Sequence, residues 1–383
     1  MFRKTPITCF SERDRGRPGS SKRAADAAAK LLASAVRAGS SCYTYAIAPR
    51  SITSHDVARA AGVSQPTVSR ALRGDPRLSE ATRKRVVETA EALQYVPSQR
   101  GRSLATRSSG QVGIVVSDLG NPFYLQVLDE LHHALRETHL RMLVLTPDAQ
   151  ETVPFERLVD GSLDGAILTT TVLDSKLPAA LSERGFPFVL LNREIDDAPC
   201  DVCVVDNHAG AKLAARELVE LGHTRIAALF GPSTTSTGRD REAGFRAGLE
   251  AAGVPLPDER WRRAPFDFDA GHRAATELLG GGPTALFCAN DILALGAFNA
   301  LHGRGIRIPE QVSLIGFDDV QLAGWDVFQL TTISQDIPGM VSAATELLLT
   351  RMANVGDPLP PRRVVLEPTM VHRRTHGPPP AKA

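Results

Sequence analysis

Short apolar runs alternate with longer amphipathic stretches from residue 111 onward, and this rhythm limits the possible folds more than any other feature. Two series of such runs occur, first at residues 112–116, 142–145, 165–168 and 188–191, then at 202–205, 226–230, 285–288 and 312–316. The gaps leave room for helices, including one opened by Asn121 and others over 209–221 and 240–252. Alternating buried strands and helices predict mainly parallel sheets covered on both faces. The expected fold class is α/β, with two doubly wound lobes.

Residues 53–72 follow a different pattern, that of two short helices meeting at a glycine. Apolar residues recur at helical spacing on either side of Gly62, which can adopt the positive φ of a sharp turn. Thr53 begins a capping-box pattern, and the Ser64 hydroxyl is placed to cap the second helix. A third helix over 79–95 can close a small core. The stretch predicts an N-terminal three-helix head of helix-turn-helix type.

A longer sequence pattern identifies this head more specifically. From Asp56 it reads D-V-A-R-A-A-G-V-S-x-x-T-V-S-R-A-L, followed by S-x-x-T-R-x-R-V, Y-x-P and R-S-L. It resembles the LacI/GalR (lac-repressor) family of bacterial transcription regulators, and the two series of strands resemble the lobes of periplasmic-binding-protein architecture. The resemblance spans residues 52–373. It implies a homodimeric transcription regulator, expected to be a repressor, whose affinity for double-stranded operator DNA is controlled by a small-molecule effector between the lobes.

The second helix of such a head lies in the major groove, with residues near its N-terminus against base edges. The residues expected to contact DNA gather around the helix starts: Thr53, Ser64, Gln65, Pro66, Thr67, Ser69 and Arg70. Three basic residues at 83–85 are either a solvated face or an anchor for phosphates. The resemblance adds Arg102 and Leu104, in a hinge helix that folds on operator DNA and pushes the leucine into the minor groove. Gly101 replaces the usual alanine and should make that helix costlier to form by up to ~1 kcal/mol.

Loops that follow the strands of an α/β lobe point into a cleft where ligands bind. Polar and aromatic residues in those loops are the expected effector contacts: Asp118, Phe123, Tyr124, Asn192, Arg193, Thr235, Thr237, Arg241, Phe266, Asn290, Asp318 and Gln335. Each matches a position that the family uses, most clearly in the motifs T-G-x-x-R, C-A-N-D and G-F-D-D. Other roles stay open for some of them. Phe123 and Phe266 also suit a core, and Asn290 or Asp291 can cap the helix that follows.

Carboxylate, guanidinium and aromatic side chains together suit a polyhydroxylated ligand such as a sugar or polyol. The two arginines, Arg193 and Arg241, also permit a sugar acid or another carboxylate. Asp318 can pair with Arg241 as part of the fold even if it also binds the ligand. The residues alone do not separate these ligand classes.

No cofactor and no metal site are expected. His132 and His133 point about a hundred degrees apart on a helix and cannot chelate one ion together. Cys200 and Cys203 lack a second pair or a nearby histidine, so we interpret them as small strand residues. No P-loop, G-x-S-x-G, H-E-x-x-H or dinucleotide motif occurs, and we expect no enzyme. Two competing classes are an enzyme with an accessory head and a secreted solute-binding protein, the latter disfavoured by the head and the lack of an export signal.

Charge is segregated along the 383 residues, although the net charge is only +1. Residues 1–50 carry ten Lys or Arg against three acids, residues 51–107 carry ten against five, and the remainder carries about −11. A basic N-terminal part suits phosphate contacts, and an acidic body limits indiscriminate adhesion to DNA. Five scattered cysteines indicate a reducing compartment, and no apolar run is long enough for a membrane helix. We expect a cytoplasmic, nucleoid-associated protein with no membrane partner.

These patterns divide the chain into five parts. Residues 1–50 are expected to be a disordered basic extension, either an artefact of start-codon choice or an arm that adds DNA affinity. Residues 51–97 form the helix-turn-helix DNA-binding domain, and residues 98–107 form the hinge helix or linker. Residues 108–373 form the effector-binding and dimerisation domain. Residues 374–383, which lack the heptads of a tetramerising coil, are expected to be a disordered tail.

Overall fold

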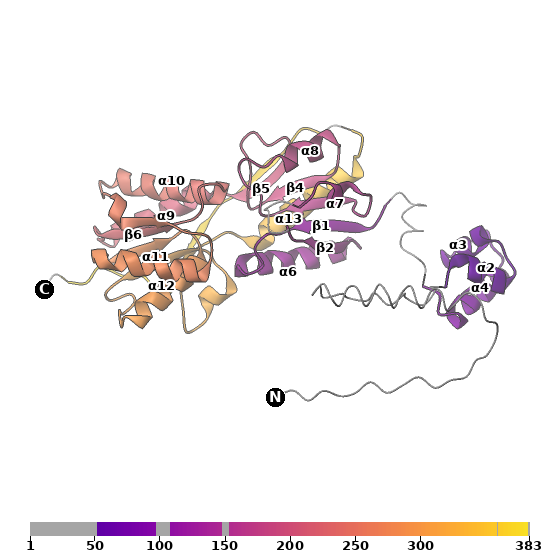
Figure 1. Cartoon of the computed structure of the whole chain (residues 1–383), viewed down its shortest axis with the longest axis horizontal. Coiled ribbons are helices and arrows are strands. Elements are labelled where there is room, and N and C mark those ends of the chain that lie inside the picture. Colours follow the sequence, from indigo (N-terminus) through magenta and orange to yellow (C-terminus); the bar gives the residue numbers. More distant parts are fainter. Residues whose placement is uncertain (1–51, 97–107, 148–152, 358, 382–383) are drawn as a thin grey trace, which may run out of the picture. The chain divides into compact units, whose positions relative to one another are not determined.

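The computed structural model describes residues 52–96, 108–147, 153–357 and 359–381, and the chain divides into two compact units after Pro97 (Figure 1). The first unit contains the head, and the second contains both lobes of the body. The predictions for residues 1–50 and for the hinge segment 98–107, with Arg102 and Leu104, lie outside the described residues. No helix in the described part of the chain is long and apolar enough to cross a membrane.

Three helices build the head: α2 (Ser54–Ala61), α3 (Gln65–Leu72) and α4 (Glu80–Ala92). Their facing sides share one small core, made of Val57, Ala58, Ala61, Val68, Ala71, Val86 and Ala90. These residues occupy the positions that recur at helical spacing in the sequence. The predicted three-helix head is confirmed.

Local caps fix where these helices begin and end. Thr53 and Asp56 form the expected capping box at α2, and Gly62 ends that helix with a φ of 65°. The cap expected from the Ser64 side chain is wrong, because its hydroxyl lies 2.8 Å from the Thr67 hydroxyl and accepts no backbone N–H of α3. The chain can still begin α3 there, since a proline in the first turn has the φ that a helix needs.

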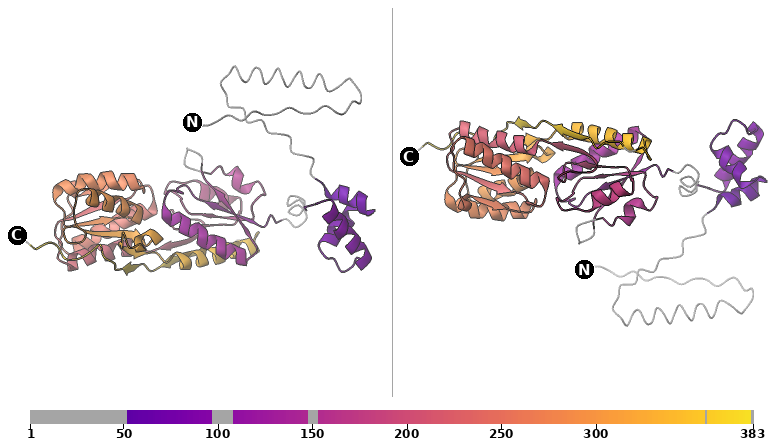
Figure 2. Two further views of the ribbon diagram at one scale, coloured as in Figure 1. Left: turned by 90° about the horizontal axis from the view of Figure 1, so that it is seen from below. Right: turned by 90° about the horizontal axis from the view of Figure 1, so that it is seen from above.

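Two six-stranded sheets form the centres of the two lobes (Figures 1 and 2). Sheet A is parallel and has the order β11 (Arg363–Leu366), β5 (Asp201–Val205), β4 (Phe188–Leu191), β3 (Gly165–Leu168), β1 (Gln111–Val115) and β2 (Arg141–Leu145). Sheet B has the order β12 (Thr369–Val371), β10 (Thr331–Ser334), β9 (Ser313–Asp318), β8 (Ala285–Cys288), β6 (Ile226–Phe230) and β7 (Trp261–Arg263). Its edge strand β12 is antiparallel to β10.

Every apolar run identified in the sequence forms a strand, but one of them belongs to the other lobe. Residues 202–205, assigned to the second series, form β5, which pairs with β4 and β11 in sheet A. The strands β7, β10, β11 and β12 have no counterpart among the predicted runs. They are short and partly polar, such as T-T-I-S in β10, so their apolar signal is weak.

Helices cover both faces of each sheet (Figure 2). On sheet A, α6 (Pro122–Glu137) and α13 (Ile337–Ala353) pack on one face, and α7 (Glu156–Val159) and α8 (Leu177–Glu183) lie on the other. On sheet B, α9 (Asn207–Glu220) packs with α10 (Ser236–Ala251), and α11 (Phe268–Leu278) packs with α12 (Asp291–Gly303). The described connections include short 3-10 helices at Asp258–Arg260, Leu279–Gly281 and Gln321–Gly324.

The strands of sheet A alternate between two cores. In β4, Phe188 and Leu190 join the core under α7 and α8, whereas Val189 and Leu191 join the core shared with α6 and α13. Successive side chains of a strand point to opposite faces, so a strand buried on both faces is an uninterrupted apolar run. This is why these strands are readable from the sequence.

The chain passes between the sheets three times, after β5, after β10 and after β11. Its last part therefore returns to sheet B. Thr375 is buried, and its hydroxyl accepts the Thr331 N–H at 2.8 Å and donates to the Leu314 carbonyl at 2.7 Å. The Gly377 N–H donates to the Ser313 hydroxyl at 3.0 Å. The expectation of a disordered tail from residue 374 is wrong for residues 374–377, because these hydrogen bonds fix them on the sheet.

Candidate DNA-binding and effector sites

The start of α3 presents the residues expected to contact DNA. Pro66 is exposed at this end, and Gln65 and Arg70 are half-buried on the same short helix. The Gln65 amide donates to the Ser54 hydroxyl at 3.3 Å, which ties the start of α3 to the start of α2. This geometry is that of a helix-turn-helix, in which the second helix carries its N-terminal residues outward for base contact. The contacts themselves stay predictions.

The basic residues of α4 lie on its solvent side. Lys84 and Arg85 are exposed, and Lys84 lies 3.9 Å from Glu88 one turn later. Such an exposed ion pair contributes little to stability. Replacing Glu88 by a DNA phosphate as the partner of Lys84 would therefore cost little stability.

In the second lobe, Arg241 is the centre of a buried polar network. Its Nη1 donates to Asp318 Oδ1 at 2.9 Å and to the Ala289 carbonyl at 2.7 Å, and its Nε donates to Asn207 Oδ1 at 2.7 Å. Its guanidinium carbon lies 3.7 Å from the centre of the Phe317 ring. The structural pairing of Asp318 with Arg241, left open by the sequence, is present.

The buried charges of this network shift one another's ionisation. Burial raises the pKa of Asp318 to about 6, and the charge and hydrogen bond of Arg241 oppose that rise. Burial also raises the pKa of Asp291 well above its ordinary value, with a further contribution from the charge of Asp318. Asp291 is fully buried and bonds the Thr332 hydroxyl at 2.6 Å and the Val320 N–H at 2.9 Å. It holds the loop after β9 in place and does not cap α12.

In the first lobe, Asn192 and Arg193 follow β4 directly. Asn192 has a φ of 69°, and its amide nitrogen lies 3.5 Å from the Tyr124 hydroxyl. The Arg193 guanidinium lies 6.0 Å from the centre of the Tyr124 ring and donates to the Thr170 carbonyl at 3.4 Å. Partial burial raises the pKa of Asp118, while two backbone hydrogen bonds and Arg193 oppose the rise. These side chains form a polar cluster beside the ring of Tyr124.

The two lobes approach each other at this edge. The Leu173 N–H donates to the Thr234 carbonyl at 2.9 Å, and the Glu194 N–H donates to the Ser236 hydroxyl at 3.0 Å. Arg193 of the first lobe is among the charges that lower the pKa of Asp318 in the second. The clusters of the two lobes therefore act on one another electrostatically.

Three predicted effector residues carry a buried polar atom without a hydrogen-bond partner in the described part of the chain. These atoms are Asn192 Oδ1, Arg193 Nε and Gln335 Oε1. A buried polar atom left unpaired costs about 1–3 kcal/mol, so native proteins satisfy nearly all of them. Gln335 also donates to Asp318, which links it to the Arg241 network. Unused donors and acceptors on both lobes are what a polar ligand requires.

Other predicted residues have structural contacts. Thr235 and Asn290 cap α10 and α12, accepting the N–H groups of Gly238 at 3.1 Å and Leu293 at 3.0 Å. The cap proposed for Asn290 is therefore present. The Thr237 hydroxyl is buried 3.3 Å from that of Thr235.

The two phenylalanines differ in burial. Phe123 is 2% exposed in the core and packs edge-on against Tyr124. Phe266 is half-buried over Gly231, which has no room for a Cβ beneath the ring. Phe266 is therefore better placed than Phe123 to cover a ligand.

Two residues of the network were not among the predicted contacts. Asn207, two residues after the end of β5, accepts from Arg241, and Phe317 lies under the same guanidinium. The rule that strand-to-helix loops face the cleft could have identified Asn207. The run at 202–205 was predicted in the second series, and no residue of the loop after it was among the expected effector contacts.

A helix-turn-helix head and a body of two doubly wound lobes with polar facing loops define a ligand-responsive DNA-binding regulator. Residues 53–98 match the model described as bacterial regulatory proteins, lacI family, and residues 215–376 match a periplasmic binding protein-like domain. The regulator DegA of Bacillus subtilis is 33% identical, over 85% of this chain and 98% of its own length. GalR of Escherichia coli is 34% identical, over 86% and 97%.

Solved structures agree with this assignment. A CelR–cellobiose complex has 31% identity and a TM-score of 0.64, covering 85% of this chain and 99% of its own. The lac repressor dimer bound to operator and the anti-inducer ONPF has 26% identity and a TM-score of 0.74, with the same coverage. The chain belongs to the LacI family of bacterial regulatory proteins, and it is a helix-turn-helix transcriptional regulator.

Proposed function

We propose that the chain is a homodimeric repressor whose affinity for a pseudo-palindromic operator is controlled by a small polar molecule bound between its lobes. The observation that carries this proposal is the set of buried, unpaired polar atoms on Asn192, Arg193 and Gln335. They lie at the carboxyl edges of both sheets, where ligands of α/β proteins bind. Two heads related by two-fold symmetry would read the two half-sites.

The ligand class that fits these groups is a sugar, a polyol or a sugar acid. A carboxylate such as Asp318 accepts two hydroxyl hydrogens side by side, and a guanidinium such as Arg193 donates to oxygens in the same way. Phe266 would cover the apolar face of a sugar ring. Relatives support this class, because one structure is titled a CelR–cellobiose complex. A LacI family regulator from Enterococcus faecium, at 26% identity and a TM-score of 0.63 over 70% of this chain, is titled with bound ribose.

The head would act through α3. We assign Gln65, Pro66 and Arg70 to base edges in the major groove, where such residues discriminate sequence. Thr53, Ser64, Thr67 and Ser69 would contact the DNA around them. Effector binding would act on DNA through residues 98–107, with a coupling of ~1–3 kcal/mol that is reciprocal between the two ligands.

We further propose that the chain has no catalytic activity and acts in the cytoplasm. The compared relatives are named as transcriptional regulators, and the DNA that such a regulator reads is cytoplasmic. An enzyme carrying an accessory head is the competing class. Turnover of a ligand identified by binding would favour that class instead.

The effector site is tested by Asp318→Asn, which keeps the size of the side chain and removes its charge. Isothermal titration and thermal shift with sugars, polyols and sugar acids should give a specific ligand for the unaltered protein, because a ligand raises the melting temperature by linkage. We expect Asp318→Asn to abolish this response while operator binding persists. Asp326→Asn, an exposed acid of the same lobe, is the matched control. An intact response in Asp318→Asn would refute the site.

A further inference from the structure

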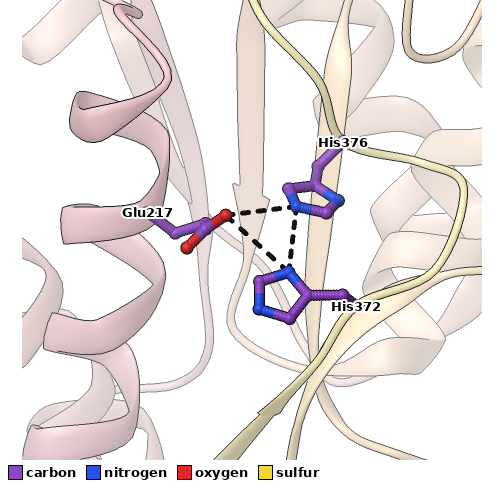
Figure 3. A group of neighbouring side chains, drawn as sticks. All are labelled: Glu217, His372 and His376. Atoms are coloured by element: carbon purple, nitrogen blue, oxygen red, sulfur yellow. Dashed lines mark hydrogen bonds and ion pairs between the residues drawn. The ribbon is translucent and has the colours of Figure 1, made fainter.

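Glu217, His372 and His376 bring three ligand-type atoms together on the second lobe (Figure 3). Glu217 projects from α9, and both histidines lie in the irregular segment that follows β12. His372 Nδ1 lies 3.1 Å from His376 Nε2, and Glu217 Oε1 lies 3.2 Å from His376 Nε2 and 3.7 Å from His372 Nδ1. The three atoms form a nearly regular triangle.

This triangle has the dimensions of one face of a tetrahedral metal site. With metal–nitrogen and metal–oxygen bonds of ~2.0–2.1 Å, neighbouring ligand atoms of a tetrahedron lie ~3.3–3.4 Å apart. The three measured separations bracket that value. Two imidazoles and one carboxylate are also the ligand set that zinc and related divalent transition metals take.

The surroundings hold the ligands in place. The second ring nitrogen of His376, Nδ1, lies 3.0 Å from the Thr331 hydroxyl, an outer contact of the kind that orients metal-bound histidines. Arg373, between the two histidines, bonds Asp319 at 2.6 Å and so keeps its charge engaged elsewhere. The side chain of His376 is 11% exposed and that of His372 is 55% exposed. One side of the triangle is thus packed and the other faces solvent.

We propose that Glu217, His372 and His376 bind a divalent transition-metal ion of the zinc class, with the solvent side open for water. The ion would fasten the C-terminal segment to α9. A metal site of this kind cannot be predicted from neighbouring residues in the sequence. Glu217 and His376 are 159 positions apart, and no short motif joins them. The adjacent pair His132 and His133, by contrast, has its rings 5.8 Å apart and edge-on.

The test is a Co²⁺ titration of the full-length protein after metal removal, followed by displacement with Zn²⁺. Tetrahedral Co²⁺ absorbs visible light strongly, so the spectrum reports both binding and geometry. We expect one equivalent to bind and Zn²⁺ to displace it. His372→Ala and Glu217→Gln should each lose this equivalent, and Zn²⁺ should raise the melting temperature of the unaltered protein but not of these two variants.

His302→Ala is the matched control, since His302 is an exposed histidine in the last turn of α12. It should bind Co²⁺ like the unaltered protein. Two results would overturn the proposal: no tetrahedral Co²⁺ spectrum in the unaltered protein, or equal binding by His372→Ala and His302→Ala. Because His372 is more than half exposed, its replacement should not prevent folding, and far-ultraviolet circular dichroism would confirm this.

Discussion

Asp318 shows how burial sets the chemistry of a single residue. Its carboxylate is 4% exposed and bonds Arg241 and Gln335, so it is held in place before any ligand arrives. Burial outweighs the arginine and raises its pKa to about 6. A buried carboxylate with a raised pKa can change its charge in the pH range where many regulators work.

The raised pKa of Asp318 predicts a pH-dependent stability. The folded protein takes up a proton at about pH 6, and the unfolded chain does so only near the ordinary value of 3.8. Between these values the folded state binds more protons, so the contribution of Asp318 to stability falls as the pH rises from about 4 to 6. Relative to Asp318→Asn, the unaltered protein should lose up to ~3 kcal/mol of unfolding free energy over this window.

The measurement is urea unfolding of the body in both proteins at several pH values. Asp326→Asn serves again as the control and should follow the unaltered protein. The opposite result would be an unfolding free energy of the unaltered protein that rises relative to Asp318→Asn as the pH rises. It would mean that the ion pair with Arg241 outweighs burial and that the pKa of Asp318 is lowered. In that case the sign of the prediction is wrong.

At the scale of single elements, strands that are buried on both faces can be predicted from their apolar runs. Gly165–Leu168 and Phe188–Leu191 are apolar throughout because both faces of the sheet are covered, and they were predicted directly. The short helix α7 and the edge strand β7 carry little apolar signal and were not. The helix caps of the head are equally local, and Thr53 with Asp56 was identified from spacing alone.

The two cap positions of the head give effects of different size. Thr53→Ala removes a hydroxyl that accepts the Asp56 N–H, so it should destabilise α2 by ~1 kcal/mol. Ser64→Ala removes a hydroxyl that bonds only Thr67 among the described contacts, so its effect should be smaller. Hydrogen exchange in the absence of DNA would measure the difference, read at the α2 amides for Thr53→Ala and at the α3 amides for Ser64→Ala. Equal loss of protection in both variants would contradict the assigned caps.

In the whole molecule, segments that cross back from one sheet to the other connect the two lobes of the body. The strand β11 and the helix α13 come after strands β6 to β10 of sheet B in sequence yet pack on sheet A. Domain closure around a ligand uses a few such connecting residues.

The proposed link between lobes and head predicts separable defects in DNA binding. Leu104→Ala should reduce bending of the operator and keep half-site selectivity, because the apolar wedge is lost and the reading helix is kept. Arg70→Ala should do the reverse and lose ~1–3 kcal/mol of discrimination against a changed base pair. Gel-shift and bending assays on both variants would measure this. Unchanged bending in Leu104→Ala would count against the hinge.

The helix-turn-helix head and the central strands could be predicted from the chain alone, and so could the positions of Asn192 and Arg193 just after a strand. Each of these depends on neighbours in the chain: a cap three residues from its partner, an apolar run, or a residue just after a strand. Three further facts depend on the folded chain: β5 joins sheet A, Asn207 accepts a hydrogen bond from Arg241, and Glu217 lies beside His372 and His376. These partners lie far apart in the chain, and the periodicity of apolar residues predicts local structure but not contacts between distant segments.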